Sequence, residues 1–348
     1  MKRRVTSLVG LLVGAGSVGK RHASVLANRY QKVIVIDSNP AALMWASHEL
    51  PCETVCASSL EEVRPSIQAS ADDITAVIAT WGPSHFQTFE QLVTMGVSRV
   101  FCEKPLATSL QQIRSMRRLC SDTDVALTAG LHLRYRGIVE FINSVSRESL
   151  GGKPTSFVVD GGARCIATNG THWLDLAIGV FGSPPRSVVA DLNSAPVNPR
   201  SSELLYWGGA ASWEFSNGER LTINYDNRSS VHERVRIYAA NGVVEIDSSF
   251  TVRAFRRDQD EIAADKRVAR TGDVTPTSVG EHSTQFNEVL SQQLDEIENL
   301  TSPRYTAEAA FTTAEALLLA FEASKSGRRL ACPATDEVIN ACTDWNIS

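Results

Sequence analysis

The sequence has neither an excess of basic residues nor a long hydrophobic run. Its 34 Lys and Arg residues are outnumbered by 39 Asp and Glu residues, and the formal net charge is −5. Without a basic field, we expect no binding to nucleic acid or to an anionic membrane. No apolar stretch reaches the ~20 residues that a membrane-spanning helix needs, and no internal repeat or low-complexity linker is present. These absences favour a soluble, folded protein.

Cysteine motifs typical of metal or disulfide sites are also missing. The seven cysteines form no Cys-x-x-Cys pair, and Cys52 and Cys56 have no nearby His or second pair that would complete a zinc site. Buried reduced thiols are the simpler interpretation, and no metal site is predicted. The basic start, Met1–Arg4, resembles an export signal, but the short apolar run after it leads into a glycine loop that cleavage would remove. We therefore expect a cytoplasmic protein.

With 348 residues, the chain is long enough for two domains. Strand-like apolar segments alternate with helix-like segments at first, and they cover residues 8–13, 32–36, 53–56, 74–80, 99–102 and 125–128. Near-continuous apolar strands between helices indicate a parallel sheet that is covered on both faces. We predict a doubly wound α/β Rossmann domain over residues 1–126.

After about residue 130 the strand-like segments follow one another directly. They cover residues 156–160, 187–192, 210–215, 221–225, 235–239 and 243–247. Asn217-Gly218 and Asn241-Gly242 separate pairs of these segments, and Asn-Gly favours tight hairpin turns. Residues 256–281 are polar and loop-like, and helical patterns follow at 282–299 and 307–326. For residues 127–348 we predict an α+β domain with a mostly antiparallel, open-faced sheet that carries helices.

The first strand-like segment leads into a glycine-rich loop, Gly14-Ala15-Gly16-Ser17-Val18-Gly19. In this context the first glycine permits a tight turn, the second allows close approach of a pyrophosphate, and the third allows helix–strand packing. Asp37 ends the second strand-like segment, where a carboxylate can bind the ribose hydroxyls and repel a 2′-phosphate. The loop therefore predicts a dinucleotide site that prefers NAD to NADP. In the alternative interpretation, Asp37 only caps a loop.

Two further motifs follow the glycine loop along the chain. One is Cys102-Glu103-Lys104-Pro105-Leu106-Ala107, and the other runs from Asn169-Gly170-Thr171-His172 to Asp175. In this order they resemble the Gfo/Idh/MocA family, which includes glucose–fructose oxidoreductase and inositol dehydrogenase. Ala79–His85 and Leu133-Arg134-Tyr135 extend the resemblance over most of the chain.

The resemblance implies roles for these residues. Lys104 would bridge the reacting hydroxyl and the cofactor, and a cis bond to Pro105 would fix where the lysine points. His172 would be the general acid/base. This agrees with the chemistry of alcohol oxidation, in which an imidazole takes the proton and an ammonium stabilises the alkoxide. Asp175 would share a helix face with His172 and orient its ring or contact the substrate. The remaining expected contacts are Thr80, Trp81, His85 and Glu103 for the cofactor, and Thr168, Asn169 and Arg134 for the substrate.

One position departs from the pattern of the family. Thr168 stands where family dehydrogenases often carry an Asp, and a hydroxyl cannot supply the charge of that carboxylate. The Asn-Gly-Thr-His form also resembles a branch of the family associated with surface-sugar and nucleotide-sugar pathways. Other interpretations remain open: His85 could cap its helix, His132 and Arg134 could pack between domains, and only Trp81 is a candidate for sugar stacking.

The leading hypothesis is hydride transfer between NAD(H) and a hydroxyl or ketone carbon of a sugar, cyclitol or nucleotide-sugar. One alternative is redox-neutral chemistry with tightly bound NAD, and another is a non-catalytic dinucleotide-binding sensor. The resemblance further implies a homodimer or homotetramer formed through the open face of the second sheet. The segment Ala211–Phe215 is compatible with such a contact.

Overall fold

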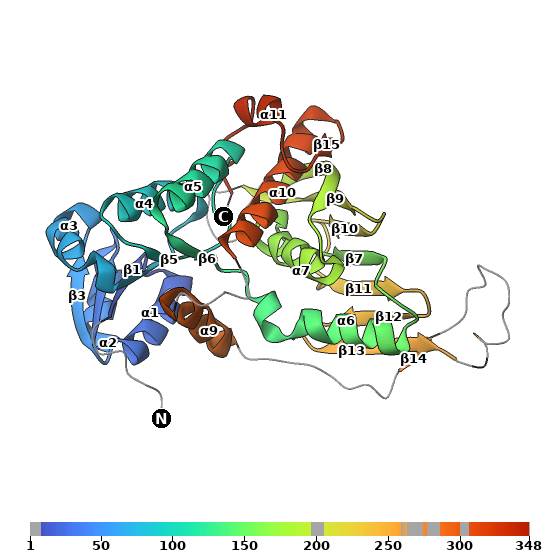
Figure 1. Cartoon of the computed structure of the whole chain (residues 1–348), viewed down its shortest axis with the longest axis horizontal. Helices are drawn as coiled ribbons and strands as arrows, with labels where there is room; N and C mark the ends of the chain where they lie inside the picture. The colour runs from blue at the N-terminus through green and yellow to red at the C-terminus, as the bar shows by residue number, and fades with distance from the viewer. Residues whose placement is uncertain are drawn as a thin grey trace.

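Two β-sheets with helices between and around them make up the computed structural model (Figure 1). The structure describes residues 8–195, 205–258, 260, 262, 274–276, 286–299 and 306–347. The predicted loop-rich stretch at 256–281 falls largely outside these ranges. No helix in the described part of the chain is long and apolar enough to cross a membrane.

The first sheet is parallel and has six strands in the order β3-β2-β1-β4-β5-β6. Its strands are β1 (Val9–Val13), β2 (Lys32–Ile36), β3 (Glu53–Ala57), β4 (Ile74–Ile78), β5 (Arg99–Cys102) and β6 (Ala126–Ala129). The connecting helices are α1 (Ser17–Arg29), α2 (Pro40–Glu49), α3 (Leu60–Ala69), α4 (Gly82–Thr94) and α5 (Leu110–Thr123), with a 3₁₀ turn at Ala71–Asp73. The predicted doubly wound Rossmann fold is confirmed.

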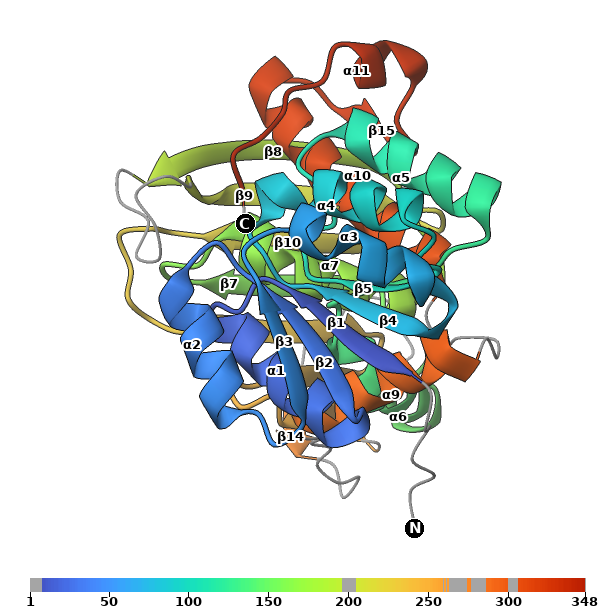
Figure 2. The ribbon, with the colours of Figure 1, turned by 90° about the vertical axis from the view of Figure 1, so that its left-hand side faces the viewer.

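Alternate residues of these strands are buried on opposite faces of the sheet. Leu12, Val33 and Val77 pack with α1 and α2 on one face, whereas Leu11 and Ile34 belong to the core on the other face. Because both faces are apolar, the strands read as continuous hydrophobic runs. Because the strands are parallel, the loops at their carboxyl ends lie at one edge of the sheet (Figure 2).

The second sheet has nine strands in the order β14-β13-β12-β11-β7-β10-β9-β8-β15, and β7–β10 is its one parallel pair among the described residues. Its strands are β7 (Ser156–Gly161), β8 (Pro185–Ala195), β9 (Tyr206–Phe215), β10 (Arg220–Tyr225), β11 (Arg234–Ala239), β12 (Gly242–Ile246), β13 (Val252–Arg257), β14 (Val274–Pro276) and β15 (Leu330–Ala331). The turns at Asn217-Gly218 and Asn241-Gly242 join antiparallel pairs, as expected, and Gly218 has a φ of +90°. Strands β13, β14 and β15 were not predicted from the sequence.

Helices pack against one face of this sheet. They are α6 (Ile138–Ser149), α7 (Thr171–Phe181) and α10 (Ala307–Ser326), preceded by short turns at Leu133–Arg136 and Ile166–Gly170. Trp213 of β9 is fully buried on this face, and its indole nitrogen donates to the carbonyl of Ala316 at 2.9 Å. Ala211 and Phe215 are buried beside it. The apolar residues of the segment Ala211–Phe215 therefore face the chain's own helices, and only its alternate polar residues face the open side.

Two C-terminal segments return to the first sheet. Helix α9 (Phe286–Asn299) packs against α1, where Arg29 and Tyr30 bind the carboxylate of Glu298 (Figure 2). After α11 (Asp336–Asn340), the amide of Trp345 donates to the carbonyl of Thr108 at 2.9 Å. The predicted domain boundary between residues 126 and 127 stays a prediction. Strand β6 continues to Ala129, and α9 packs on the first sheet although it comes late in the sequence.

Candidate active site

The glycine loop between β1 and α1 has the geometry that a dinucleotide requires. Gly14 has a φ of +94°, and a Cβ there would lie 2.8 Å from the backbone of Ala79. A Cβ on Gly19 would lie 2.0 Å from the carbonyl oxygen of Gly14, so only glycine lets α1 approach β1 this closely. In contrast, a Cβ on Gly16 would meet no atom within 4 Å. The space over Gly16 is where a pyrophosphate would lie.

Helix α1 begins with free backbone donors. Its N-cap is Gly16, which provides no side-chain cap, and the first turn has no acidic residue. Gly16, Ser17 and Val18 are exposed. The amides of this first turn and the helix dipole therefore suit an anion, and the residues present fit a dinucleotide.

Asp37 lies directly beside this loop. One of its carboxylate oxygens accepts the amide of Ala15 at 2.6 Å, and the other accepts the amide of Asn39 at 2.8 Å. Asp37 thus fixes the loop after β1 to the end of β2. A carboxylate oxygen has more than one acceptor site, so this contact is compatible with binding of a ribose, which stays a prediction.

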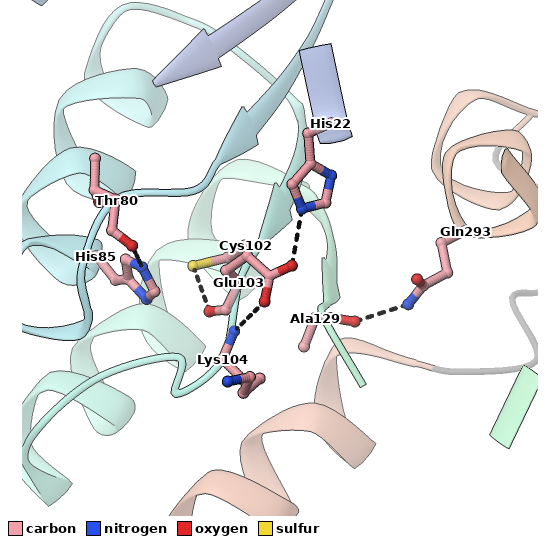
Figure 3. Close-up of polar contacts among 8 residues, drawn as sticks. All are labelled: His22, Thr80, His85, Cys102, Glu103, Lys104, Ala129 and Gln293. Carbon is pink, nitrogen blue, oxygen red and sulfur yellow. Dashed lines mark hydrogen bonds and ion pairs between the residues drawn. The ribbon is translucent and has the colours of Figure 1, made fainter. Parts of the chain in front are cut away.

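Glu103 and Lys104 follow β5, and the Lys104–Pro105 peptide bond is cis. The imidazole Nε2 of His22, on α1, lies 2.8 Å from Glu103 Oε1, and the Lys104 amide donates to Glu103 Oε2 at 3.2 Å (Figure 3). Burial alone would raise the pKa of Glu103, but His22 and the Lys104 ammonium hold that pKa below its ordinary value of 4.5. The carboxylate therefore fixes the Lys104 backbone to the helix that begins at the glycine loop.

His22 was missed from the sequence, although a signal was present. It lies on the face of α1 that also buries Ala23 and Leu26, and its side chain is 1% exposed. A histidine in the apolar stripe of a helix has to find a partner, because a buried polar group without one destabilises the fold.

A second buried imidazole holds the same loop from the other side. His85 on α4 places Nδ1 2.7 Å from the carbonyl oxygen of Pro105 and Nε2 3.0 Å from that of Thr80 (Figure 3 shows the Thr80 contact). Burial lowers the pKa of His85 below 6.5, although both carbonyls oppose that shift. This ring thus connects the loop after β4 with the Lys104 loop. Trp81, in the same segment as Thr80, is 44% exposed.

His172 is the second residue of α7 (Thr171–Phe181). Lys104 and Thr171 line one small cavity, and the ring of His132 lies 4.5 Å from the ring of His172. His172 Nδ1 is buried without a hydrogen-bond partner among the described residues. Burial lowers the pKa of His172 well below 6.5, and His132, Lys104 and Arg136 lower it further. The lysine and the histidine of the two motifs are therefore close enough to act on each other.

The other expected substrate residues are distributed around His172. Asp175 is fully buried, pairs with Arg134 at 2.9 Å and accepts the hydroxyl of Thr313 at 3.0 Å. Arg134 also donates to the Asp175 carbonyl at 3.1 Å. Thr168 is buried and Asn169 is partly buried in the turn before α7. Asp175 and Arg134 thus bind each other, and contacts of these four residues with a substrate stay predictions.

A parallel sheet in this strand order, with a glycine loop that opens the first helix, is typical of a dinucleotide-binding Rossmann domain. Residues 9–131 match the model of the Gfo/Idh/MocA family, described as an oxidoreductase family with an NAD-binding Rossmann fold. Over these residues the chain is similar to the NAD-binding domain of that family.

Individual relatives agree with this assignment. Inositol 2-dehydrogenase of Rhizobium meliloti is 26% identical over 246 residues, which cover 64% of this chain and 72% of that enzyme. D-Apiose dehydrogenase of Paraburkholderia graminis is 26% identical over 207 residues, or 53% of each chain. The crystal structure of GenD2 from gentamicin A biosynthesis, in complex with NAD, has the same fold with a TM-score of 0.71 at 19% identity, and the match covers 96% of this chain and 98% of that one.

Proposed function

We propose that this protein transfers a hydride between NAD(H) and a hydroxyl or ketone carbon of a sugar, cyclitol or nucleotide-sugar. The relatives named inositol 2-dehydrogenase and D-apiose dehydrogenase support a polyhydroxylated substrate. The single observation that carries the proposal is that Lys104 lies near His172, while the Lys104 backbone is fixed to α1 through Glu103.

Lys104 and His172 divide the work on the reacting oxygen. His172 is held neutral, so its ring can accept the hydroxyl proton during oxidation and return it during reduction. The Lys104 ammonium stabilises the alkoxide that forms as the proton leaves. Bound NAD supplies the carbon that takes up or gives back the hydride.

Turnover by two variants tests this assignment. Purified protein is incubated with NAD and a panel of sugars, cyclitols and nucleotide-sugars, and the formation of NADH is followed by absorbance. We expect His172→Ala and Lys104→Ala each to lower kcat by about 100-fold or more. The matched controls His48→Ala and Lys153→Ala, at exposed positions, should turn over like the parent protein. Unchanged turnover in both site variants would refute the assignment. Stoichiometric NAD that survives purification without net NADH formation would instead support redox-neutral chemistry.

We further propose a cytoplasmic homodimer or homotetramer that forms through the open face of the second sheet. The seven cysteines are free, as in a reducing compartment. Val158, Val189 and Thr222 lie on that face and are half-buried. Light scattering coupled to size-exclusion chromatography measures the mass, and a monomer at micromolar concentration would contradict the proposal.

A further inference from the structure

A short segment near the C-terminus, residues 343–347, crosses from α10 to the loops of the first sheet (Figure 1). We call it the C-terminal strap. On α10 it is held by Glu322, whose Oε1 accepts the amide of Thr343 at 2.7 Å and the indole N–H of Trp345 at 2.9 Å. The Trp345 ring packs against Phe321 of the same helix, with centroids 5.2 Å apart. Glu322 is 7% exposed, so one buried carboxylate holds two donors of the strap.

The C-terminal strap also contacts the loops after β4 and β5. The amide of Trp345 donates to the carbonyl of Thr108 at 2.9 Å. Ile347 is fully buried, and its carbonyl oxygen lies over Gly82 at the start of α4. A Cβ on Gly82 would lie 2.4 Å from that oxygen and 3.1 Å from the ring of Pro105. The strap, the loop after β4 and the loop after β5 therefore meet at one point.

These two loops belong to the nicotinamide half of the predicted dinucleotide site. A Rossmann fold consists of two mononucleotide-binding halves. The glycine loop and Asp37 lie in the first half, at β1 and β2, which holds the pyrophosphate and the adenosine. Strands β4, β5 and β6 form the second half, where Thr80 and Trp81 follow β4 and Lys104 follows β5. The strap thus contacts the loops of the half that faces the nicotinamide.

Hydride transfer also depends on how the two sheets are held together, because Lys104 follows β5 and His172 lies on α7. An error of about 1 Å in the position of a reacting group can lower the rate about 100-fold. We propose that the C-terminal strap holds the loops after β4 and β5 in the positions that nicotinamide binding and hydride transfer require, with Glu322 as its anchoring residue. This proposal rests on the proposed hydride transfer with NAD(H).

Two ligands that differ in the nicotinamide test the proposal without turnover. ADP-ribose contains the adenosine, the pyrophosphate and the second ribose of NADH but lacks the nicotinamide, and both affinities are measured by titration calorimetry. Glu322→Leu removes the acceptor of two N–H groups and keeps an apolar side chain on α10. We expect it to weaken NADH about tenfold, since binding would then have to order the two loops, while ADP-ribose keeps the parent affinity. An equal fall in both affinities, or in neither, would overturn the proposal.

Three further variants separate positioning from general stability. Glu322→Gln keeps an oxygen that can accept both N–H groups, so it should retain the parent ratio of the two affinities. Gly82→Ala acts at the other end of the strap, because its Cβ would displace the Ile347 carbonyl, and it should lower the ratio as Glu322→Leu does. The matched control is Glu315→Leu, since Glu315 is another buried carboxylate of α10 and accepts the amide of Ala334, outside the strap, at 2.8 Å. A ratio lowered as much by Glu315→Leu as by Glu322→Leu would refute a specific role of the strap.

Turnover distinguishes this proposal from the proposed function. In a protein that oxidises a sugar with NAD, Glu322→Leu should lower kcat by about 10–100-fold, and Glu322→Gln should restore it. A lowered ratio in Glu322→Leu, when the parent protein turns over no sugar, would refute the proposed function and leave the strap standing. Turnover by the parent together with an unchanged ratio in Glu322→Leu would refute the strap alone.

Discussion

Replacing His22 by Phe removes the partner of a buried carboxylate and keeps an aromatic ring at this position. His22 is 1% exposed, and Glu103, 2.8 Å away, is 13% exposed. His22 also packs against Phe101, with ring centroids 5.0 Å apart, so a Phe side chain retains an aromatic contact there. The variant leaves Glu103 buried without its strongest hydrogen bond. Removing one member of a buried pair costs about 3–5 kcal/mol, and we expect the lower end because Glu103 retains the amide of Lys104.

Differential scanning calorimetry measures the effect. A loss of about 3 kcal/mol corresponds to a decrease in Tm of about 6–12 °C, at roughly 2–4 °C per kcal/mol for chains of 150–250 residues, and less for a longer cooperative unit. The pKa of Glu103 is lowered in the folded protein, so its contribution is present above its ordinary pKa of 4.5 and is lost as the pH falls through the folded pKa. The Tm difference between parent and variant should therefore narrow below about pH 4.

A double-mutant cycle completes the test. If His22 and Glu103 stabilise the fold through each other, His22→Phe and Glu103→Gln together should cost at least about 1 kcal/mol less than the sum of the single variants. The control His48→Phe, on the exposed face of α2, should leave Tm unchanged. A His22→Phe variant within about 0.5 kcal/mol of the parent, the range typical of surface changes, would refute the reasoning, and so would an additive cycle.

Three other predictions concern the cofactor loop and His172. Gly16→Ala should keep the parent Tm, because its Cβ meets no protein atom, and should lose NAD affinity, because that Cβ would occupy the space of the pyrophosphate. Gly19→Ala should unfold at a lower temperature, because its Cβ would overlap a carbonyl oxygen. Fluorescence titration with NADH measures the affinity and calorimetry measures the Tm, and equal behaviour of the two variants would contradict the steric argument. Asp37→Ser should raise NADP affinity relative to NAD, and an unchanged ratio in the same titration would show that Asp37 does not select the cofactor. The pKa of His172 is lowered well below 6.5, so the neutral base should persist as the pH falls. The acid limb of the pH profile of kcat/KM for oxidation should therefore lie below pH 6.5. Lys104→Met removes a nearby positive charge and should move this limb to higher pH, and a limb that stays in place would contradict the effect of Lys104.

Local sequence patterns were sufficient to predict the first sheet and its loop. The runs that became β1, β2 and β4 are apolar on both sides, and the spacing of Gly14, Gly16 and Gly19 is set by the turn itself. Such features depend on neighbours in sequence, so the residues that cause them are visible together. The hairpins at Asn217-Gly218 and Asn241-Gly242 were predictable for the same reason.

Features that join distant segments could not be predicted in this way. The pairing of His22 with Glu103 spans 81 positions. Helix α9 returns to α1, where its apolar residues join the core and Arg29 and Tyr30 bind Glu298. No local periodicity specifies such contacts. The segment Ala211–Phe215 shows a related difficulty. Its alternation of apolar and polar residues predicts two faces of a strand, but it does not indicate whether helices of the same chain or another subunit cover the apolar face.

The same distinction separates the motif residues from those that position them. Lys104 belongs to a recognisable motif, yet its place depends on two imidazoles from different helices, His22 through Glu103 and His85 through the carbonyl of Pro105. Each contact alone fixes one side of the loop, and together they connect it to α1 and to α4. Helix α1 begins at the glycine loop, so the His22–Glu103 pair connects the Lys104 backbone to the helix that follows the pyrophosphate site.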